Sequence, residues 1–232
     1  MDLIWESFRE ALALIRRFDP SVTNAAARSL WISTTAVGLA ALAGLPVGTG
    51  LARHSFPGYR LVVLAFRAGM SFPTVFIGIV CYAVFSRRGP FGAMDLLYTP
   101  WLIVVGEFLL ALPIVVSLTH GAVKSLDPRI GETSLTLGAG PFRRWATYLS
   151  EARVGVTLAI VMAFARCVTE LGIAMMVGGN IKYRTRTLAT ATALETAKGE
   201  FSRGMAMGVI LLAIALCVTV CIMLLSRDDA RV

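Results

Sequence analysis

Charged residues are scarce in this sequence. Only 16% of its 232 residues are Asp, Glu, Lys or Arg, whereas 56% are hydrophobic. Soluble domains carry about a quarter charged residues, so this composition excludes an ordinary soluble globular protein. It is typical of an integral membrane protein, and at this length we expect one transmembrane domain over residues 1–232.

The usual enzyme motifs are missing too. His54 and His120 are the only histidines, no H-E-x-x-H pattern occurs, and the stretch "GMSFP" at 69–73 lacks the final glycine of a G-x-S-x-G nucleophile elbow. No G-x-x-x-x-G-K-[ST] phosphate loop is present, so the chain cannot bind and hydrolyse ATP by that route. We therefore expect no catalytic residue, no metal ion and no cofactor in this chain.

Cysteine spacing and net charge indicate which bound metals and which macromolecular partners to expect. The four cysteines lie within apolar runs and show no CxxC spacing, which argues against a zinc or redox site. Lys and Arg exceed Asp and Glu by 22 to 14, but most of these cations lie between apolar runs, where lipid headgroups explain them better than nucleic acid. We expect membrane lipid as a partner and no nucleic acid.

Five stretches are long and apolar enough to cross a bilayer, since a spanning helix needs roughly 20 mostly apolar residues. They are 29–52, 61–86, 101–123, 154–177 and 204–226. Residues 1–20 place apolar side chains on one helical face and charges on the other, as in a helix lying in the membrane interface, and their charges argue against a secretory signal. The predicted fold is all-α, with five transmembrane helices after an interfacial helix.

The loop 124–153 is more elaborate than a connector requires. Asp127-Pro128 favours a helix start, residues 129–137 suit a helix, and Gly138 with Gly140-Pro141 interrupts it. We expect a short helix that ends at a glycine, followed by a second short helix. An odd number of spans puts the termini on opposite sides, but the cations are divided almost evenly between the two sides and do not orient the chain.

Two segments carry a family resemblance. Glu132-Thr133-Ser134, followed after three residues by Gly138-Ala139, resembles the cytoplasmic EAA loop of ABC importer membrane subunits. "DPRIGETSLTLGA" together with "MMVGGNIKYRTRTLATATALETAKGEF" resembles the tungstate permeases, relatives of the molybdate permeases, and the likeness covers nearly the whole chain.

That resemblance implies a type I importer bundle of the MetI-like, molybdate permease-like kind in the cell (inner) membrane. The subunit would form a homodimer, receive tungstate or molybdate from an extracytoplasmic oxyanion-binding protein, and couple through loop 124–153 to two separate ABC ATPase subunits that bind ATP and Mg. The C-terminus would be cytoplasmic and the N-terminus outside. The ATPase-coupling residues it implies are Glu132, Thr133, Ser134, Leu135, Leu137, Gly138 and Ala139.

Ionisable side chains in the fourth span suggest a second site. Arg166 and Glu170 are four residues apart, so they share a helical face and can pair, and burying each of them alone would cost at least ~2.5 kcal/mol. The pair, with Glu107, could hold the span in the bundle, or it could contact the cargo. A further alternative is a secondary transporter in which the pair relays protons.

The end of the fourth span, "TELGIAMMVGGN", ends in two glycines that allow unwound backbone facing a passing oxyanion, and two methionines there could form an apolar gate. The threonine-rich segment beyond it would form a lid, bordering the outer gate in the resembled family. The predicted path and gate residues are Arg166, Thr169, Glu170, Met175, Met176, Gly178, Gly179, Asn180, Thr185 and Thr187.

Overall fold

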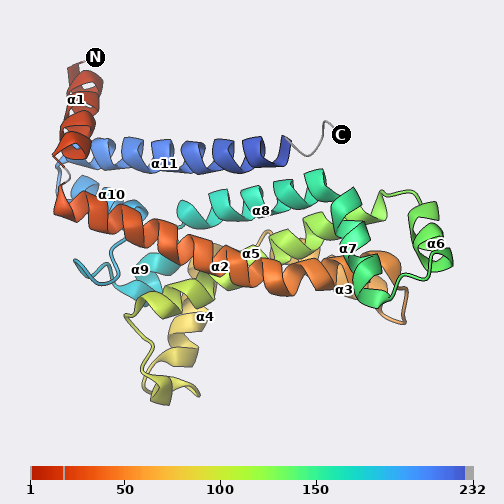
Figure 1. Cartoon of the computed structure of the whole chain (residues 1–232). Helices are drawn as coiled ribbons and strands as arrows, with labels where there is room; N and C mark the ends of the chain where they lie inside the picture. The colour runs from red at the N-terminus through yellow and green to blue at the C-terminus, as the bar shows by residue number, and fades with distance from the viewer. Residues whose placement is uncertain (1, 18, 228–232) are drawn as a thin grey trace.

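In the computed structural model, which describes residues 2–17 and 19–227, every regular element of the described chain is a helix (Figure 1). The elements are α1 (Asp2–Arg16), α2 (Pro20–Arg53), α3 (Tyr59–Gly69), α4 (Thr74–Phe85), the 3-10 turn η1 (Gly92–Met94), α5 (Pro100–Lys124), α6 (Arg129–Thr136), α7 (Pro141–Glu151), α8 (Arg153–Val168), α9 (Gly172–Gly178), α10 (Leu188–Ala197) and α11 (Phe201–Arg227). The all-α prediction is confirmed.

Three single helices are long and apolar enough to cross a membrane: α2, α5 and α11. Two further pairs pass the same test as broken spans, α3 with α4 and α8 with α9. If each pair is counted as one span, the described residues hold up to five. The number five and the membrane borders of each span stay predictions.

The stretch expected as a continuous second span, 61–86, is instead two helices that meet at 101°. Pro73 lies between them as the N-cap of α4. A proline has no backbone N–H and disfavours helical geometry in the residue before it, so Pro73 favours the break between α3 and α4. The fourth stretch is likewise bent, by 54°, between α8 and α9.

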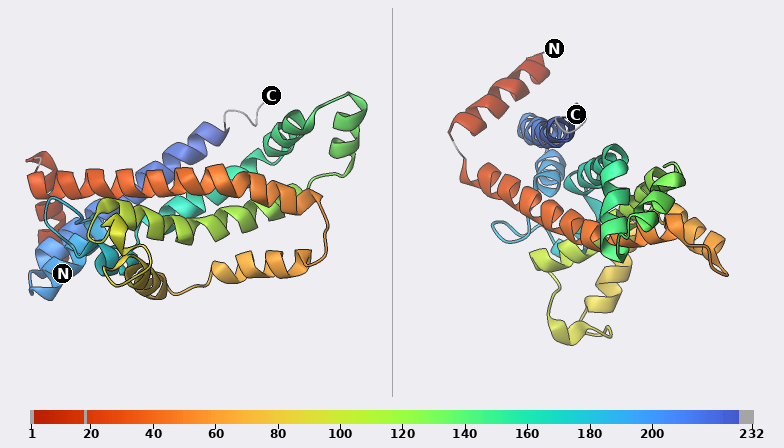
Figure 2. Two further views of the ribbon diagram at one scale, coloured as in Figure 1. Left: turned by 90° about the horizontal axis from the view of Figure 1, so that it is seen from below. Right: turned by 45° about the vertical axis from the view of Figure 1, so that its right-hand side comes forward.

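The centre of the bundle is the contact between α2 and α5, which lie side by side along much of their length (Figure 2). Gly44 and Gly48 share one face of α2, and a Cβ added at Gly48 would lie 2.9 Å from Thr119 Cβ on α5. Small residues at such spacing let two apolar helices approach closely, which is how helices associate where no water drives them together.

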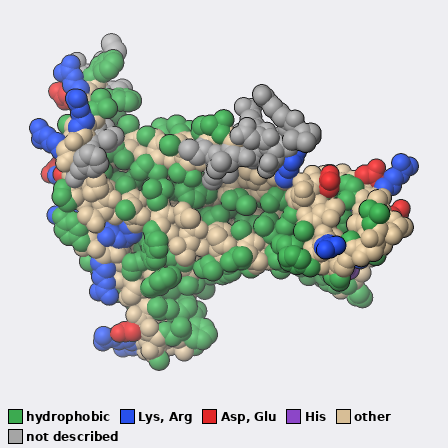
Figure 3. Space-filling view, in the orientation of Figure 1, with side chains coloured by type: hydrophobic (Ala, Val, Ile, Leu, Met, Phe, Trp, Pro, Cys, Tyr) green, Lys and Arg blue, Asp and Glu red, His purple; other side chains and the backbone are tan. Residues whose placement is uncertain are grey.

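The bundle is elongated, and different elements occupy its two ends. Helices α6 and α7 lie at one end, whereas α9, α10 and the loop that contains η1 lie at the other (Figure 1). In the space-filling view, hydrophobic side chains cover much of the middle and Lys and Arg side chains gather toward the ends (Figure 3). Helix α1 crosses the start of α11 and packs on it, at the end that holds α10.

Candidate functional site

The α6–α7 segment has a defined shape set by Gly138. After α6, the N–H of Gly138 donates to the carbonyl of Leu135 at 2.9 Å, and the N–H of Ala139 donates to the carbonyl of Ser134 at 2.9 Å. These two bonds form a Schellman motif, which requires a left-handed residue, and Gly138 has φ +74°. The glycine therefore ends α6 and turns the chain back toward α7.

Helix α6 presents two different faces. Gly131 and Ser134 are buried, and Gly131 lies so close to the hydroxyl of Tyr148 on α7 that a Cβ there would clash with it. Glu132 and Leu135 lie on an exposed face. Gly131 thus lets α6 approach Tyr148 of α7, and the Glu132 and Leu135 side chains stay exposed.

Tyr148 joins this segment to the end of α2. The Arg53 guanidinium lies 4.2 Å from the centre of the Tyr148 ring, a cation–π contact. A groove of about 540 Å³ runs between the end of α2 and the two short helices, and Glu132, Arg144 and Trp145 are among its lining residues. Sequence reasoning missed Arg53 and Tyr148, because only the folded chain brings them together.

All seven predicted coupling residues lie in α6 or the turn after it. Ser134 is buried and Ala139 is half-buried, whereas the other five are exposed: Glu132, Thr133, Leu135, Leu137 and Gly138. Exposed leucines beside a carboxylate form a surface suited to a protein partner, and the coupling role of these residues stays a prediction.

At the opposite end, Arg166 and Glu170 form the predicted ion pair, with Nη1 and Oε2 2.8 Å apart. The Glu170 side chain is 2% exposed and that of Arg166 is 43% exposed. The second carboxylate oxygen of Glu170 accepts the backbone N–H of Ile173 at 3.1 Å, in the first turn of α9. Glu170 therefore caps α9 and fixes the bend between α8 and α9.

Glu107 lies against the same bend from α5. It is buried, and the thiol of Cys167 on α8 donates to its backbone carbonyl at 3.6 Å. The geometry supports the reading in which these ionisable residues hold the fourth span in the bundle. Thr169 also serves the helix, since its hydroxyl donates to the carbonyl of Ala165 at 2.9 Å and so has no proton left for a passing anion.

The break in the fourth span lies between Thr169 and Leu171, before α9, whereas the sequence favoured unwinding at the glycine pair. Gly178 is the last residue of α9 and Gly179 is its C-cap, with φ +68°. The Glu170 carboxylate accepts a backbone hydrogen bond at this break, a contact that composition alone does not reveal. Of the two predicted gate methionines, Met176 packs against Gly78 of α4 and Met175 is exposed.

Residues 180–187 form a tightly bonded turn. The buried hydroxyl of Thr185 donates to the carbonyl of Gly178 at 2.6 Å and accepts the N–H of Ile181 at 2.9 Å. Asn180 accepts from Arg186 Nε at 3.1 Å, and Thr187 caps α10 in a capping box with Thr190. The predicted lid residues thus shape this turn and the start of α10.

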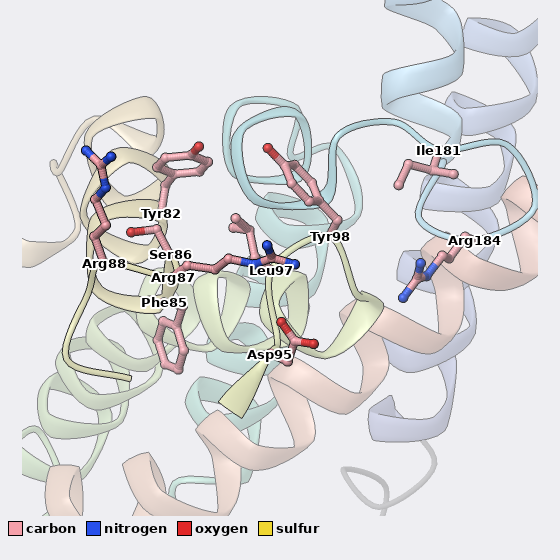
Figure 4. A pocket seen from close by; sticks show the side chains of 10 residues that line it. All are labelled: Tyr82, Phe85, Ser86, Arg87, Arg88, Asp95, Leu97, Tyr98, Ile181 and Arg184. Carbon is pink, nitrogen blue, oxygen red and sulfur yellow. The ribbon is translucent and has the colours of Figure 1, made fainter. Parts of the chain in front are cut away.

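This turn faces the loop between α4 and α5 across a cavity of about 710 Å³ (Figure 4). The lining residues are Tyr82, Phe85, Ser86, Arg87, Arg88, Asp95, Leu97, Tyr98, Ile181 and Arg184. Tyr98 ties the two sides together, because its N–H donates to the carbonyl of Val177 at 2.9 Å and a Cβ at Gly179 would lie 2.8 Å from its ring. Only the adjacent Arg87 and Arg88 hinted at this site in the sequence.

Comparisons with known proteins place these features in context. Residues 44–227 match the family described as binding-protein-dependent transport system inner membrane component. The chain is 37% identical over 217 residues to the tungstate uptake system permease protein TupB of Campylobacter jejuni, which covers 94% of this chain and 91% of that protein. It is 34% identical over 228 residues to the protein of the same name from Peptoclostridium acidaminophilum, covering 98% of this chain and 100% of that protein.

A solved structure shares the fold. A chain from the inward-facing MetNI methionine ABC transporter superposes with a TM-score of 0.73, covering 91% of this chain and 97% of the other, at 18% sequence identity. At that identity the likeness shows the architecture alone.

Proposed function

This chain belongs to the family of binding-protein-dependent transport system inner membrane components, and on that premise we propose that it is the permease subunit of an ATP-driven importer for tungstate, with molybdate as the second candidate. The likeness to two tungstate uptake permeases, at 34–37% identity over nearly the whole chain, is the observation that carries the proposal. The resemblance to importer permeases drawn from the sequence is confirmed.

The energy for transport comes from a separate ATPase in this proposal. Helix α6 docks on that ATPase through the exposed Glu132 and Leu135, while the close approach of Gly131 to Tyr148 holds it against α7. A rigid helix held in this way transmits the opening and closing of an ATPase as rigid-body motion. Two copies of this chain, two ATPases and an extracytoplasmic binding protein make up the importer, with the α6–α7 end and the C-terminus in the cytoplasm and the N-terminus outside.

The Arg166–Glu170 pair has a positioning role in this proposal. Its charges satisfy each other, so it offers the cargo no free cation that would trap a dianion and slow its release. By holding α9 at the bend, Glu170 keeps the far end of the fourth span at a fixed angle. The competing hypothesis, a secondary transporter, uses the same pair as a proton relay and needs no ATPase.

Uptake of radiolabelled tungstate tests the two hypotheses. The test uses cells that lack their own tungstate transporters and express this permease with its ATPase and binding protein. We expect uptake that stops when ATP is depleted and persists when an uncoupler removes the proton gradient while ATP remains. Uptake with the opposite sensitivities would support the relay and overturn the proposal.

Docking through α6 is tested separately with Glu132→Lys. The residue is exposed, so the variant should insert and fold normally and should lose co-purification with the ATPase. Arg129→Glu, a charge change of the same size and opposite sign one turn away on the same short helix, serves as a comparison, because a nonspecific charge effect would move ATPase recovery in opposite directions in the two variants. Unchanged ATPase recovery with Glu132→Lys would contradict docking through this residue.

A further inference from the structure

The two loops around the cavity of Figure 4 hold an unusual backbone. Four non-glycine residues have positive φ in the described part of the chain, and all four lie in these loops. They are Asp95 (φ 51°), Tyr98 (φ 60°), Asn180 (φ 51°) and Tyr183 (φ 61°). Such residues cost on the order of 1 kcal/mol or more each and tend to cluster where a ligand is bound, so their confinement to two facing loops directs attention to the space between them.

That space is lined by cations without partners. Arg87 reaches it from the end of α4 and Arg184 from the turn after α9, whereas Arg88 lines its edge with the guanidinium pointing away from both (Figure 4). None of the three takes part in an ion pair or a side-chain hydrogen bond with a described residue. Asp95 is the one carboxylate among the described lining residues, so the lining carries excess positive charge.

The lining also offers hydroxyl groups and an apolar wall. The hydroxyl ends of Tyr82 and Tyr98 point toward one another (Figure 4), and interaction with the Tyr82 hydroxyl raises the pKa of Tyr98. Phe85, Leu97 and Ile181 complete the lining. Guanidinium forks bind the oxygens of a tetrahedral anion two at a time, and nearby apolar surface strengthens such bonds.

We propose that this cavity is a capture site for a tetrahedral oxyanion, held between Arg87 on one loop and Arg184 on the other, with Arg88 adding positive charge at its edge. The inference rests on the proposed function, because it names the place where the imported anion first contacts this subunit. The cavity lies at the end of the bundle away from α6 and α7, which is the outer end if α6 is cytoplasmic.

The site has a direct connection to the fourth span. Tyr98 lies between the two arginine groups, its N–H is bonded to Val177 within α9, and its ring rests on Gly179 at the end of α9. An anion that bridges Arg87 and Arg184 would draw the two loops together around Tyr98. Binding of the anion would thus move the end of α9 through its contacts with Tyr98.

Equilibrium binding of radiolabelled tungstate tests the site directly. The measurement uses the permease–ATPase complex without binding protein, in nanodiscs of phosphatidylcholine, which carries no net charge. We expect Arg184→Gln and the double variant Arg87→Gln with Arg88→Gln each to weaken binding at least about tenfold, since charge-assisted hydrogen bonds are lost. Arg184→Lys, which keeps the charge without the fork, should fall in between.

Lys182→Gln is the matched control. It removes one positive charge from the same turn, but Lys182 does not line the cavity and its ammonium lies 5.0 Å from the centre of the Tyr183 ring. Under the proposal it should change tungstate binding less than twofold. If Lys182→Gln weakens binding as much as Arg184→Gln, the cations act only as a diffuse attractive field and the capture site is overturned.

Protection from trypsin gives a readout that needs no transport. Trypsin cuts after arginine, so bound tungstate should slow cleavage after Arg87 and Arg88 in the wild type and should have no such effect in Arg184→Gln. Equal protection in both proteins would contradict a site shared by the two loops. If Arg184→Gln leaves tungstate binding intact and weakens association of the binding protein instead, the loops form a docking surface and the inference is wrong.

The uptake assay separates this inference from the proposed function. If wild-type cells import tungstate with ATP and Arg184→Gln both binds and imports it normally, the capture site fails and the importer stands. If wild-type cells import no tungstate or molybdate, the proposed function fails first.

Discussion

Two glycines in the α6–α7 turn allow a clean test of whether the shape of this turn matters for coupling. Gly138 and Gly140 are two residues apart, and a Cβ added at either would meet nothing within 4 Å. They differ in backbone geometry, because Gly138 has φ +74° and Gly140 has φ −65°. Alanine at the two positions therefore adds the same methyl group in open space, with left-handed strain at one position only.

The magnitude follows from that difference. An alanine in left-handed geometry costs roughly 1–2 kcal/mol, which lowers the equilibrium ratio of the native turn to its alternatives by roughly 5–30-fold. At Gly140, alanine is a poorer N-cap for α7 but restricts the unfolded chain, two opposing effects of roughly 0.5–1 kcal/mol each. Gly138→Asn should recover most of the loss, because asparagine tolerates left-handed geometry.

The assay is binding of the purified ATPase to the permease in nanodiscs, together with ATP hydrolysis by the assembled complex. We expect Gly138→Ala to weaken ATPase binding by several-fold, Gly140→Ala to match the wild type, and Gly138→Asn to lie close to it. If Gly138→Ala and Gly140→Ala behave alike, or if Gly138→Asn is no better than Gly138→Ala, the left-handed turn is not what presents α6.

Three further predictions concern other contacts. Gly48→Leu should overpack the α2–α5 contact at a cost of about 1–3 kcal/mol and so lower the melting temperature in detergent. Gly50→Leu should not lower it, because Gly50 has open space around it, and equal melting temperatures for the two variants would contradict this packing. Glu170→Ala, which loses both the ion pair and the cap of α9, should melt below Glu170→Gln, which keeps an acceptor; the reverse order would refute the cap. The hydrogen bond from Ser21 lowers the pKa of Asp19, the N-cap of α2. The ionised Asp19 carboxylate therefore stabilises the fold fully above about pH 4, and this stabilisation is lost as the pH falls through the folded-state pKa. Wild type and Asp19→Ala should differ in stability by about 1 kcal/mol at pH 7 and converge in acid, and a difference that does not change with pH would count against this role.

The parts of the fold that sequence predicted are those governed by local chemistry. The apolar runs predicted helices, and Gly138 with Gly140-Pro141 predicted two short helices where the structure has α6 and α7. The 101° turn before α4 had a local signal in Pro73, but a proline can kink a helix or break it, and the sequence did not indicate that α4 packs on α9.

The parts of the site that sequence could not predict depend on contacts between distant segments. Nothing near Gly131 in the sequence indicates that Tyr148 lies against it, and nothing near Tyr98 indicates its bond to Val177. The spacing of Arg166 and Glu170 predicted their ion pair, yet the second role of Glu170, as the cap of α9, depends on where the helix breaks.

Helices α7, α8 and α9 lead from α6 to the cavity, and the connections between these three helices are only one to three residues long. Ala152 alone separates α7 from α8, is buried, and bonds to both helices, since its N–H donates to Tyr148 and its carbonyl accepts from Val156. Helix α8 then crosses the bundle to the bend that Glu170 fixes. Because hydrogen bonds hold both connections, we expect a displacement of α6 by the ATPase to move α8 and α9 together. The end of α9 that contacts Tyr98 would then shift in position. Glu170→Ala removes the side-chain bonds at the connection between α8 and α9, so it should lower tungstate uptake per ATP hydrolysed while α6 still binds the ATPase. An unchanged ratio would show that motion reaches the end of α9 by another route, such as the α2–α5 contact.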